Sequence, residues 1–219
     1  MRTMKVFQSN YFEFNCLMTD FARFINLPPL ERDSLDKKLF EIKALKEHLH
    51  VTEKLFTQYS QVGMNLTKIM DELVKSFQSF KEFESDPSLK SISELLQQNS
   101  DSLKTHYTLI TEQITAPLNS FITNEIDSAV EAGKTSEICY NAYVATTEKY
   151  TSLSKKKFNA PGALEEMDNR LRDAHKQAAA ADFILDRKCE LVERKKLVEI
   201  SASVCIFFLI ECFLYDLLT

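Results

Sequence analysis

Residues 42–80, IKALKEHLHVTEKLFTQYSQVGMNLTKIMDELVKSFQSF, contain a seven-residue repeat of apolar side chains. One seam of the repeat consists of Ile42, Leu49, Phe56, Gly63, Met70 and Phe77. Its companion consists of Leu45, Thr52, Tyr59, Leu66, Leu73 and Phe80. Ten of these twelve positions carry large apolar side chains. A period of about 3.5 residues held over this length predicts a helix that supercoils around a partner helix.

Turn-forming residues are scarce throughout the chain, which has 3 glycines and 5 prolines among its 219 residues. Average proteins contain about 7% glycine and 5% proline, so the elements here must be long. Turn signals at residues 84–88 and 155–162 divide the chain into predicted helices of about 33–84, 88–157 and 163–218. Because short connections make long helices fold back, we expect an all-α, elongated antiparallel three-helix coiled coil over residues 33–219. Residues 1–32 would form an N-terminal extension.

Two features predict the shape and assembly of this bundle. Pro117 lies inside the second predicted helix, where it removes one backbone hydrogen bond and bends the helix without necessarily ending it. From Val204 to Leu218 the third helix is apolar nearly all round, so it must be buried on more than one side. Dimerisation would bury it. We expect a homodimer whose interface consists of Val204, Ile206, Phe207, Leu209, Ile210 and Phe213.

Composition narrows the possible functions. The net charge of −5 argues against nucleic acid as a partner, because binding phosphates needs a clustered positive surface. The five cysteines form no CxxC pair and are expected to be reduced thiols in a cytoplasmic protein. Glu47-x-x-His50 has the spacing of a metal-ligand pair, but a di-metal bundle needs that motif twice. With no phosphate-cradling glycine loop or nucleophile elbow either, we expect no metal, no cofactor, no catalytic residues and no enzymatic activity.

Several motifs occur in a recognisable order along the second and third helices. They are the proline-marked bend Pro117-Leu118-x-x-Phe121-x-x-x-x-Ile126, the series Tyr143, Lys149-Tyr150, Leu153 and Lys155-Lys156-Lys157, and Asp182-Phe183 followed by the charged block 192–199. In these motifs the chain resembles the BAR domain superfamily, especially the BAR domains that accompany PH domains in adaptor and GTPase-activating proteins. The resemblance implies a curved homodimer that senses or stabilises membrane curvature and binds anionic phospholipid membranes. It also implies partners such as a small GTPase or an adaptor protein, and a role in membrane trafficking or endocytosis at the endosome or plasma membrane.

Two groups of cations are candidates for contact with membranes, because each cation near an anionic leaflet contributes about 1 kcal/mol. The first group, called the tip lysines here, consists of Lys149, Lys155, Lys156 and Lys157. The second group consists of Arg187, Lys188, Arg194, Lys195 and Lys196. The tip lysines could instead be an ordinary solvated charge run. The second group could instead form salt bridges with Glu190, Glu193 and Glu199.

Two other functions compete with the membrane-curvature reading. The first is a helical protein-interaction dimer that binds a GTPase or adaptor with little direct lipid binding, which the net acidity favours. The second is a coiled-coil tether anchored by Val204–Leu218, although Glu211 and Asp216 would each cost about 2.5–3.5 kcal/mol near a bilayer centre. In the N-terminal extension, Leu17, Phe21, Phe24 and Ile25 could form a membrane wedge or a strap packed on the bundle.

Overall fold

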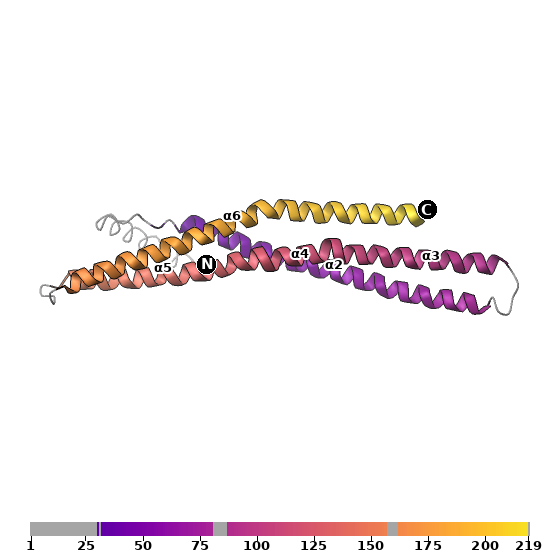
Figure 1. Cartoon of the computed structure of the whole chain (residues 1–219), viewed down its shortest axis with the longest axis horizontal. Coiled ribbons are helices and arrows are strands. Elements are labelled where there is room, and N and C mark those ends of the chain that lie inside the picture. The colour runs from indigo at the N-terminus through magenta and orange to yellow at the C-terminus, as the bar shows by residue number, and fades with distance from the viewer. Residues whose placement is uncertain (1–29, 31, 81–86, 157–161, 219) are drawn as a thin grey trace, which may run out of the picture. The chain divides into compact units, whose positions relative to one another are not determined.

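The computed structural model describes residues 30, 32–80, 87–156 and 162–218, and every regular element in these ranges is a helix (Figure 1). The first long helix is α2 (Asp33–Phe80). The second is continuous through α3 (Pro87–Ile110), the π-helical η1 (Thr111–Thr115), α4 (Ala116–Phe121), the π-helical η2 (Ile122–Ile126) and α5 (Asp127–Ser154). The third is α6 (Ala163–Leu218). The prediction of an all-α fold built from three long helices is confirmed. The proposed N-terminal wedge of Leu17, Phe21, Phe24 and Ile25 lies outside the described residues.

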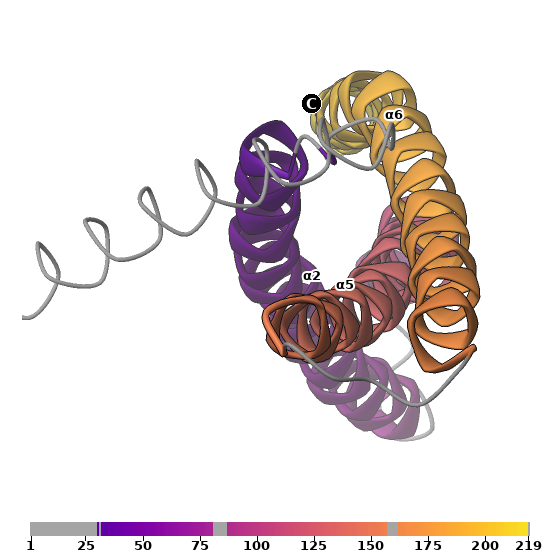
Figure 2. The same cartoon turned by 90° about the vertical axis from the view of Figure 1, so that its left-hand side faces the viewer.

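The chain divides into two compact units, and all three long helices contribute to both. Unit 1 consists of residues 1–42 and 128–190, and unit 2 consists of residues 43–127 and 191–219. Figure 2 looks toward the side of the chain where α5 ends and α6 begins, which belongs to unit 1. In each unit, residues far apart in the sequence build one core.

The core of unit 1 forms where α5 and α6 pack together. Tyr143, Leu171 and Ala178 are buried at its centre. Leu30, Cys139, Tyr140, Tyr150 and Ala174 pack around them. Nearby, α2 approaches α5 so closely that a Cβ added to Gly133 would lie 2.5 Å from a methyl carbon of Leu39. Small residues on α5 therefore allow the three helices to approach one another, as the buried Ala129, Gly133 and Ser136 show.

Unit 1 also contains a buried polar cluster centred on Arg32. Its Nη1 donates hydrogen bonds to the Ser136 carbonyl at 3.2 Å and to Asp182 Oδ1 at 3.3 Å. The Ser136 hydroxyl donates to the same Asp182 oxygen at 2.5 Å, and the guanidinium lies 4.6 Å from the centre of the Tyr140 ring. The sequence places Arg32 in the predicted N-terminal extension, residues 1–32. The structure packs it against α5 and α6, so the folded region includes residues before α2.

The core of unit 2 is an aliphatic stripe on the helical segment 103–126, covered by α2 and α6. Its fully buried members are Ile110, Ile114, Leu118, Ile122 and Ile126. Leu49 and Val74 from α2 and Val192 from α6 are buried in the same unit. At Gly63 a Cβ would lie only 2.1 Å from the Tyr107 ring. The glycine in the predicted heptad seam therefore makes room for an aromatic side chain from α3.

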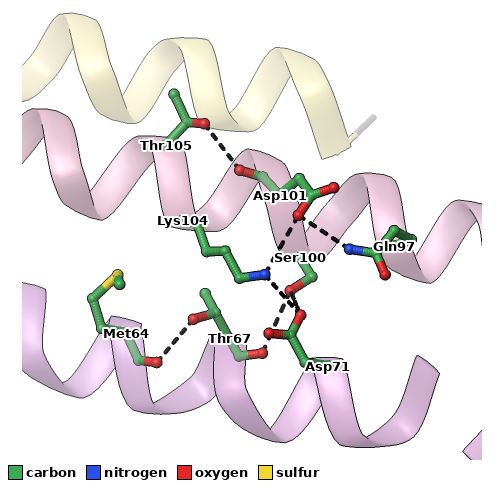
Figure 3. Close-up of polar contacts among 8 residues, drawn as sticks. All are labelled: Met64, Thr67, Asp71, Gln97, Ser100, Asp101, Lys104 and Thr105. Carbon is green, nitrogen blue, oxygen red and sulfur yellow. Dashed lines mark hydrogen bonds and ion pairs between the residues drawn. The ribbon is translucent and has the colours of Figure 1, made fainter. Parts of the chain in front are cut away.

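A polar network joins α2 to α3 within unit 2 (Figure 3). The Ser100 hydroxyl donates to Asp71 Oδ1 at 2.6 Å, and Lys104 donates to the same oxygen at 2.9 Å. The hydrogen bond from Ser100 and then that from Lys104 lower the pKa of Asp71 below its ordinary value. Ser100 is fully buried, so this pairing fixes the register of the two helices at a position where a shift would leave polar groups without partners.

Pro117 lies in α4, between the two π-helical segments, and the helix continues on both sides of it. The Ala116 amide donates to the Thr111 carbonyl, which is the longer π-helical bond. Such a bond widens the turn just before the proline, whose ring would clash with a carbonyl in a regular α-helix. The continuous path of the helix is thus explained. The bend attributed to Pro117 stays a prediction.

Candidate functional site

Three tip lysines lie at the end of α5 in unit 1. Lys149 is on the last turns of the helix, and Lys155 and Lys156 follow its final residue, Ser154. The Lys155 amide donates to the Thr151 carbonyl at 3.3 Å and the Lys156 amide to the Leu153 carbonyl at 3.1 Å. The first bond continues the α-helical pattern to Lys155, and the second closes a tighter turn as the helix ends; all three lysines are exposed. Lys157 lies outside the described residues.

Several other basic residues of unit 1 are paired with carboxylates, unlike the described tip lysines. Where α6 begins, Arg170 pairs with Glu166 at 2.6 Å and Arg172 with Asp168 at 2.8 Å. Within the described part of the chain, no ion pair involves Lys149, Lys155 or Lys156. Their charges are therefore available to an external anion without breaking a bond inside the protein.

The second predicted group of cations is largely paired with carboxylates. In unit 1, Arg187 pairs with Glu190 at 3.1 Å and also lies over the Phe183 ring, and Lys188 is half-buried. In unit 2, Lys196 pairs with Glu193 at 2.5 Å, Lys195 pairs with Glu125, and Arg194 is exposed. The exposed Arg187–Glu190 and Lys196–Glu193 pairs contribute at most about 1 kcal/mol each, so lipid phosphates could compete for Arg187 and Lys196. Membrane contact by this second group stays a prediction.

The six predicted dimer-interface residues divide between two faces of α6. Ile210 is buried and Ile206 and Phe207 are half-buried against neighbouring helices of the same chain. The Phe207 ring lies 5.4 Å from that of Phe56 on α2. Val204, Leu209 and Phe213 lie on the outer face and remain exposed, with Leu209 and Phe213 at 69% and 60% exposure. In the single chain only the outer three are open to a second subunit.

A second exposed apolar surface on α2 was not identified from the sequence as an interface. It is called the α2 stripe here and consists of Leu55, Tyr59, Val62, Leu66, Ile69, Leu73 and Phe80. These residues alternate in steps of three and four up to Leu73, so they follow the heptad repeat on a face next to the buried one. The companion seam could have identified this surface, because Tyr59, Leu66, Leu73 and Phe80 belong to it. On α3, Ile92 and Leu95 are exposed as well.

One carboxylate links the apolar end of α6 to both α2 and α3. Tyr59 Oη donates a hydrogen bond to Glu211 Oε1 at 2.8 Å, and Nε2 of the buried His106 lies 3.3 Å from the same oxygen. Burial and the bond to Glu211 raise the pKa of the Tyr59 hydroxyl. Helix α6 contains a window long and apolar enough to cross a membrane, of which 11% is buried inside the chain. The contacts of Glu211 favour packing against protein for this window, since a carboxylate is costly inside a bilayer.

The arrangement of the described residues provides surfaces suited to contact with a membrane or a partner protein. Among those residues, no group of three or more histidine, cysteine, aspartate or glutamate side chains gathers as a metal site. What the geometry provides is a set of unpaired cations at the end of α5 and two apolar helix faces, on α2 and α6, in unit 2.

Comparison with solved structures identifies similar folds. The chain is similar to the amphiphysin BAR domain from Drosophila, with a TM-score of 0.72, 11% sequence identity, and coverage of 85% of this chain and 87% of that one. A second match is the EFC/F-BAR domain of Drosophila Syndapin/PACSIN, with a TM-score of 0.36, 11% identity, and coverage of 86% and 78%. At 11% identity the first match shows a shared fold, and the TM-score of the second is too low to show one. No curated protein matches the chain.

Comparison with protein families is more specific. Residues 27–215 match the family described as the BAR domain of the APPL family. The match begins before α2 and includes Arg32, in agreement with the buried position of that residue. It confirms the resemblance to BAR domains seen in the sequence, and such domains are structural and scaffold modules. Because the match covers most of the chain, this protein belongs to the family of APPL-type BAR domains.

Proposed function

We propose that the chain is a homodimeric scaffold that binds anionic membranes through its tip lysines and senses or stabilises their curvature. Membership of the BAR family supports the membrane-curvature and scaffold role. The observation that carries the assignment to the tip is the contrast between the two groups of cations. Lys149, Lys155 and Lys156 have no internal carboxylate partners among the described residues, whereas Arg187, Lys195 and Lys196 do.

The homodimer would form through the outer face of α6 and the α2 stripe, both in unit 2. An apolar heptad face that lies beside an already packed face of the same helix is the usual sign of a further helical partner. The outer residues of α6, such as Leu209 and Phe213, would be covered in the same assembly. A second copy is the partner that best fits, because the chain belongs to the BAR family, whose members form dimers.

Location and partners follow from the same proposal. The protein would be cytoplasmic and peripheral on membranes of the endosome or plasma membrane. A small GTPase or an adaptor protein would be recruited to the dimer, which places the chain in membrane trafficking or small-GTPase signalling. The alternative is a helical interaction dimer with little lipid binding, and the net charge of −5 favours it. The tail-anchored tether is less compatible with the contacts of Glu211.

Cosedimentation with anionic vesicles over a series of salt concentrations tests the proposal. Replacing Lys155, Lys156 and Lys157 with glutamate should abolish binding while helicity and dimerisation stay intact. A control variant with Lys37, Lys54 and Lys75 replaced by glutamate has the same change in net charge at other exposed sites and should retain most of the binding. Binding by the parent should weaken as salt rises, because the Debye length falls to about 8 Å at physiological ionic strength.

Each outcome separates the candidates. Equal loss in both variants would show a nonspecific charge effect and refute the tip assignment. If the parent fails to bind anionic vesicles at any salt concentration, the protein-interaction dimer replaces the membrane scaffold. A requirement for detergent would indicate the tether.

A further inference from the structure

One exposed hydroxyl lies among the described tip lysines. Ser152 is on the last turn of α5, with Lys149 three residues before it and Lys155 and Lys156 three and four residues after it. Side chains three or four residues apart are neighbours on a helix, with Cβ atoms about 5–6 Å apart. The Lys155 amide donates to the Thr151 carbonyl, four residues back as in an α-helix, so Lys155 keeps nearly helical spacing from Ser152, whereas Lys156 lies beyond the end of the helix. Ser152 is therefore a helical neighbour of Lys149 and Lys155, and Lys156 follows four residues after it, just beyond the helix.

The other hydroxyls of this turn are placed differently. Thr151 is half-buried, and its hydroxyl donates to the Thr147 carbonyl at 2.8 Å. The Ser154 hydroxyl donates to the Thr151 carbonyl at 2.9 Å, and Ser154 is one and two residues from Lys155 and Lys156, a spacing that does not bring side chains face to face. Of Thr151, Ser152 and Ser154, Ser152 alone is exposed and also has lysines three residues before it and three and four residues after it.

We propose that Ser152 is a phosphorylation site for a serine kinase that selects basic sequences, and that its phosphate switches off membrane binding by the tip. This inference rests on the proposed function of the tip lysines. Kinases select substrates by charge pattern, and the basic residues on both sides of Ser152 provide one. The serine also lies two residues from the end of α5, where helices fray and the backbone becomes accessible.

The modification is an ordinary phosphoryl transfer from ATP. The Ser152 oxygen forms a bond to the γ-phosphorus of ATP, and the bond from that phosphorus to the oxygen bridging to the β-phosphorus breaks. ADP leaves with the bridging oxygen, and the hydroxyl proton passes to the catalytic base of the kinase. The product carries a charge of about −1.5 to −2 at neutral pH.

The new phosphate would act on the tip in two ways. It would form ion pairs with Lys149, Lys155 and Lys156. These pairs would neutralise most of the combined charge of +3 that the lysines otherwise present to the membrane. It would also place negative charge at the carboxyl end of a helix, where the helix dipole disfavours it and where the last turn is easily loosened. Both effects weaken attraction to anionic lipid.

The test uses the full chain with phosphoserine incorporated at position 152, so that binding is measured whether or not a given kinase acts. The probe is vesicles of phosphatidylserine and phosphatidylcholine, and binding is measured by cosedimentation. Loss of one to two units of charge should weaken binding by about tenfold or more. Ser152→Gln, which changes the side chain without charge, should bind as the parent does. In parallel, a kinase selective for basic sequences should phosphorylate the parent at Ser152 and leave Ser152→Ala unmodified there, as read by mass spectrometry.

Four results decide between success and failure. Weaker binding by the phosphoserine protein, with normal binding by Ser152→Gln, supports the switch. If the phosphoserine protein binds as the parent does while the triple lysine variant has lost binding, the switch is refuted and the proposed function stands. If the parent itself does not bind vesicles, the proposed function and the switch fail together. Failure of such kinases to modify Ser152 in the parent overturns its assignment as a phosphorylation site.

Discussion

Replacing Arg32 with alanine should destabilise unit 1 severely, although the residue precedes every helix in the described part of the chain. Asp182 is 8% exposed and accepts hydrogen bonds from Arg32 at 3.3 Å and from Ser136 at 2.5 Å. Without the guanidinium this carboxylate stays buried beside a single hydroxyl. Removing one partner of a buried ion pair costs about 3–5 kcal/mol, because the remaining charge has lost its compensation. The corresponding fall in melting temperature is about 6–20 °C for a chain of this size.

The assay is urea unfolding followed by circular dichroism at one fixed protein concentration, since dimerisation makes stability depend on concentration. The matched control is Lys37→Ala, because Lys37 pairs with Glu41 at 3.9 Å in solvent and such pairs contribute less than about 1 kcal/mol. The double variant Arg32→Met with Asp182→Leu should recover most of the loss, since both charges leave the core together. The reasoning is wrong if Arg32→Ala unfolds within about 0.5 kcal/mol of Lys37→Ala.

Three further predictions concern unit 2. Phe207→Glu should misfold, because the Phe207 ring packs on Phe56 of α2. Phe213→Glu should fold as a monomer, because Phe213 is exposed in the single chain. An unchanged dimer of Phe213→Glu in analytical ultracentrifugation would contradict the proposed interface. Pro117→Ala should keep its helicity by circular dichroism and alter the solution scattering profile, and superimposable profiles would show that the proline does not set curvature. Gly63→Ala should lower stability by about 1–3 kcal/mol in thermal unfolding, because its Cβ would meet the Tyr107 ring. Stabilisation, as alanine's helix propensity by itself predicts, would refute that contact.

Membrane binding and dimerisation are expected to use different surfaces of the protein. The outer face of α6 is apolar enough to enter lipid by composition, yet the α2 stripe in the same unit is apolar with heptad spacing. Heptad spacing is a signature of packing against another helix, whereas insertion into lipid requires no such spacing. We therefore expect the apolar faces to bind a second copy and the tip lysines to bind the membrane, with the two functions on separate surfaces.

The periodicity and composition of the sequence determined the number and type of elements. Helix period and the scarcity of glycine and proline are local properties, so they predicted three long helices whose described bounds differ from those expected by only a few residues. The same local signals predicted that the helix continues through Pro117. They also brought the family resemblance into view, because the proline, the aromatic series and the lysine run lie in fixed order along the chain.

Only the tertiary structure decided which apolar face of each helix is already covered. The heptad repeat on α2 is broad enough to supply two adjacent faces, and sequence spacing does not say which one the chain's own helices use. Burial of Val74 and exposure of Leu73, adjacent residues of equal apolar character, show the outcome. Arg32 is a similar case, because its partners Ser136 and Asp182 lie 104 and 150 residues away. Such contacts depend on how separate helices meet in space, which no local pattern records.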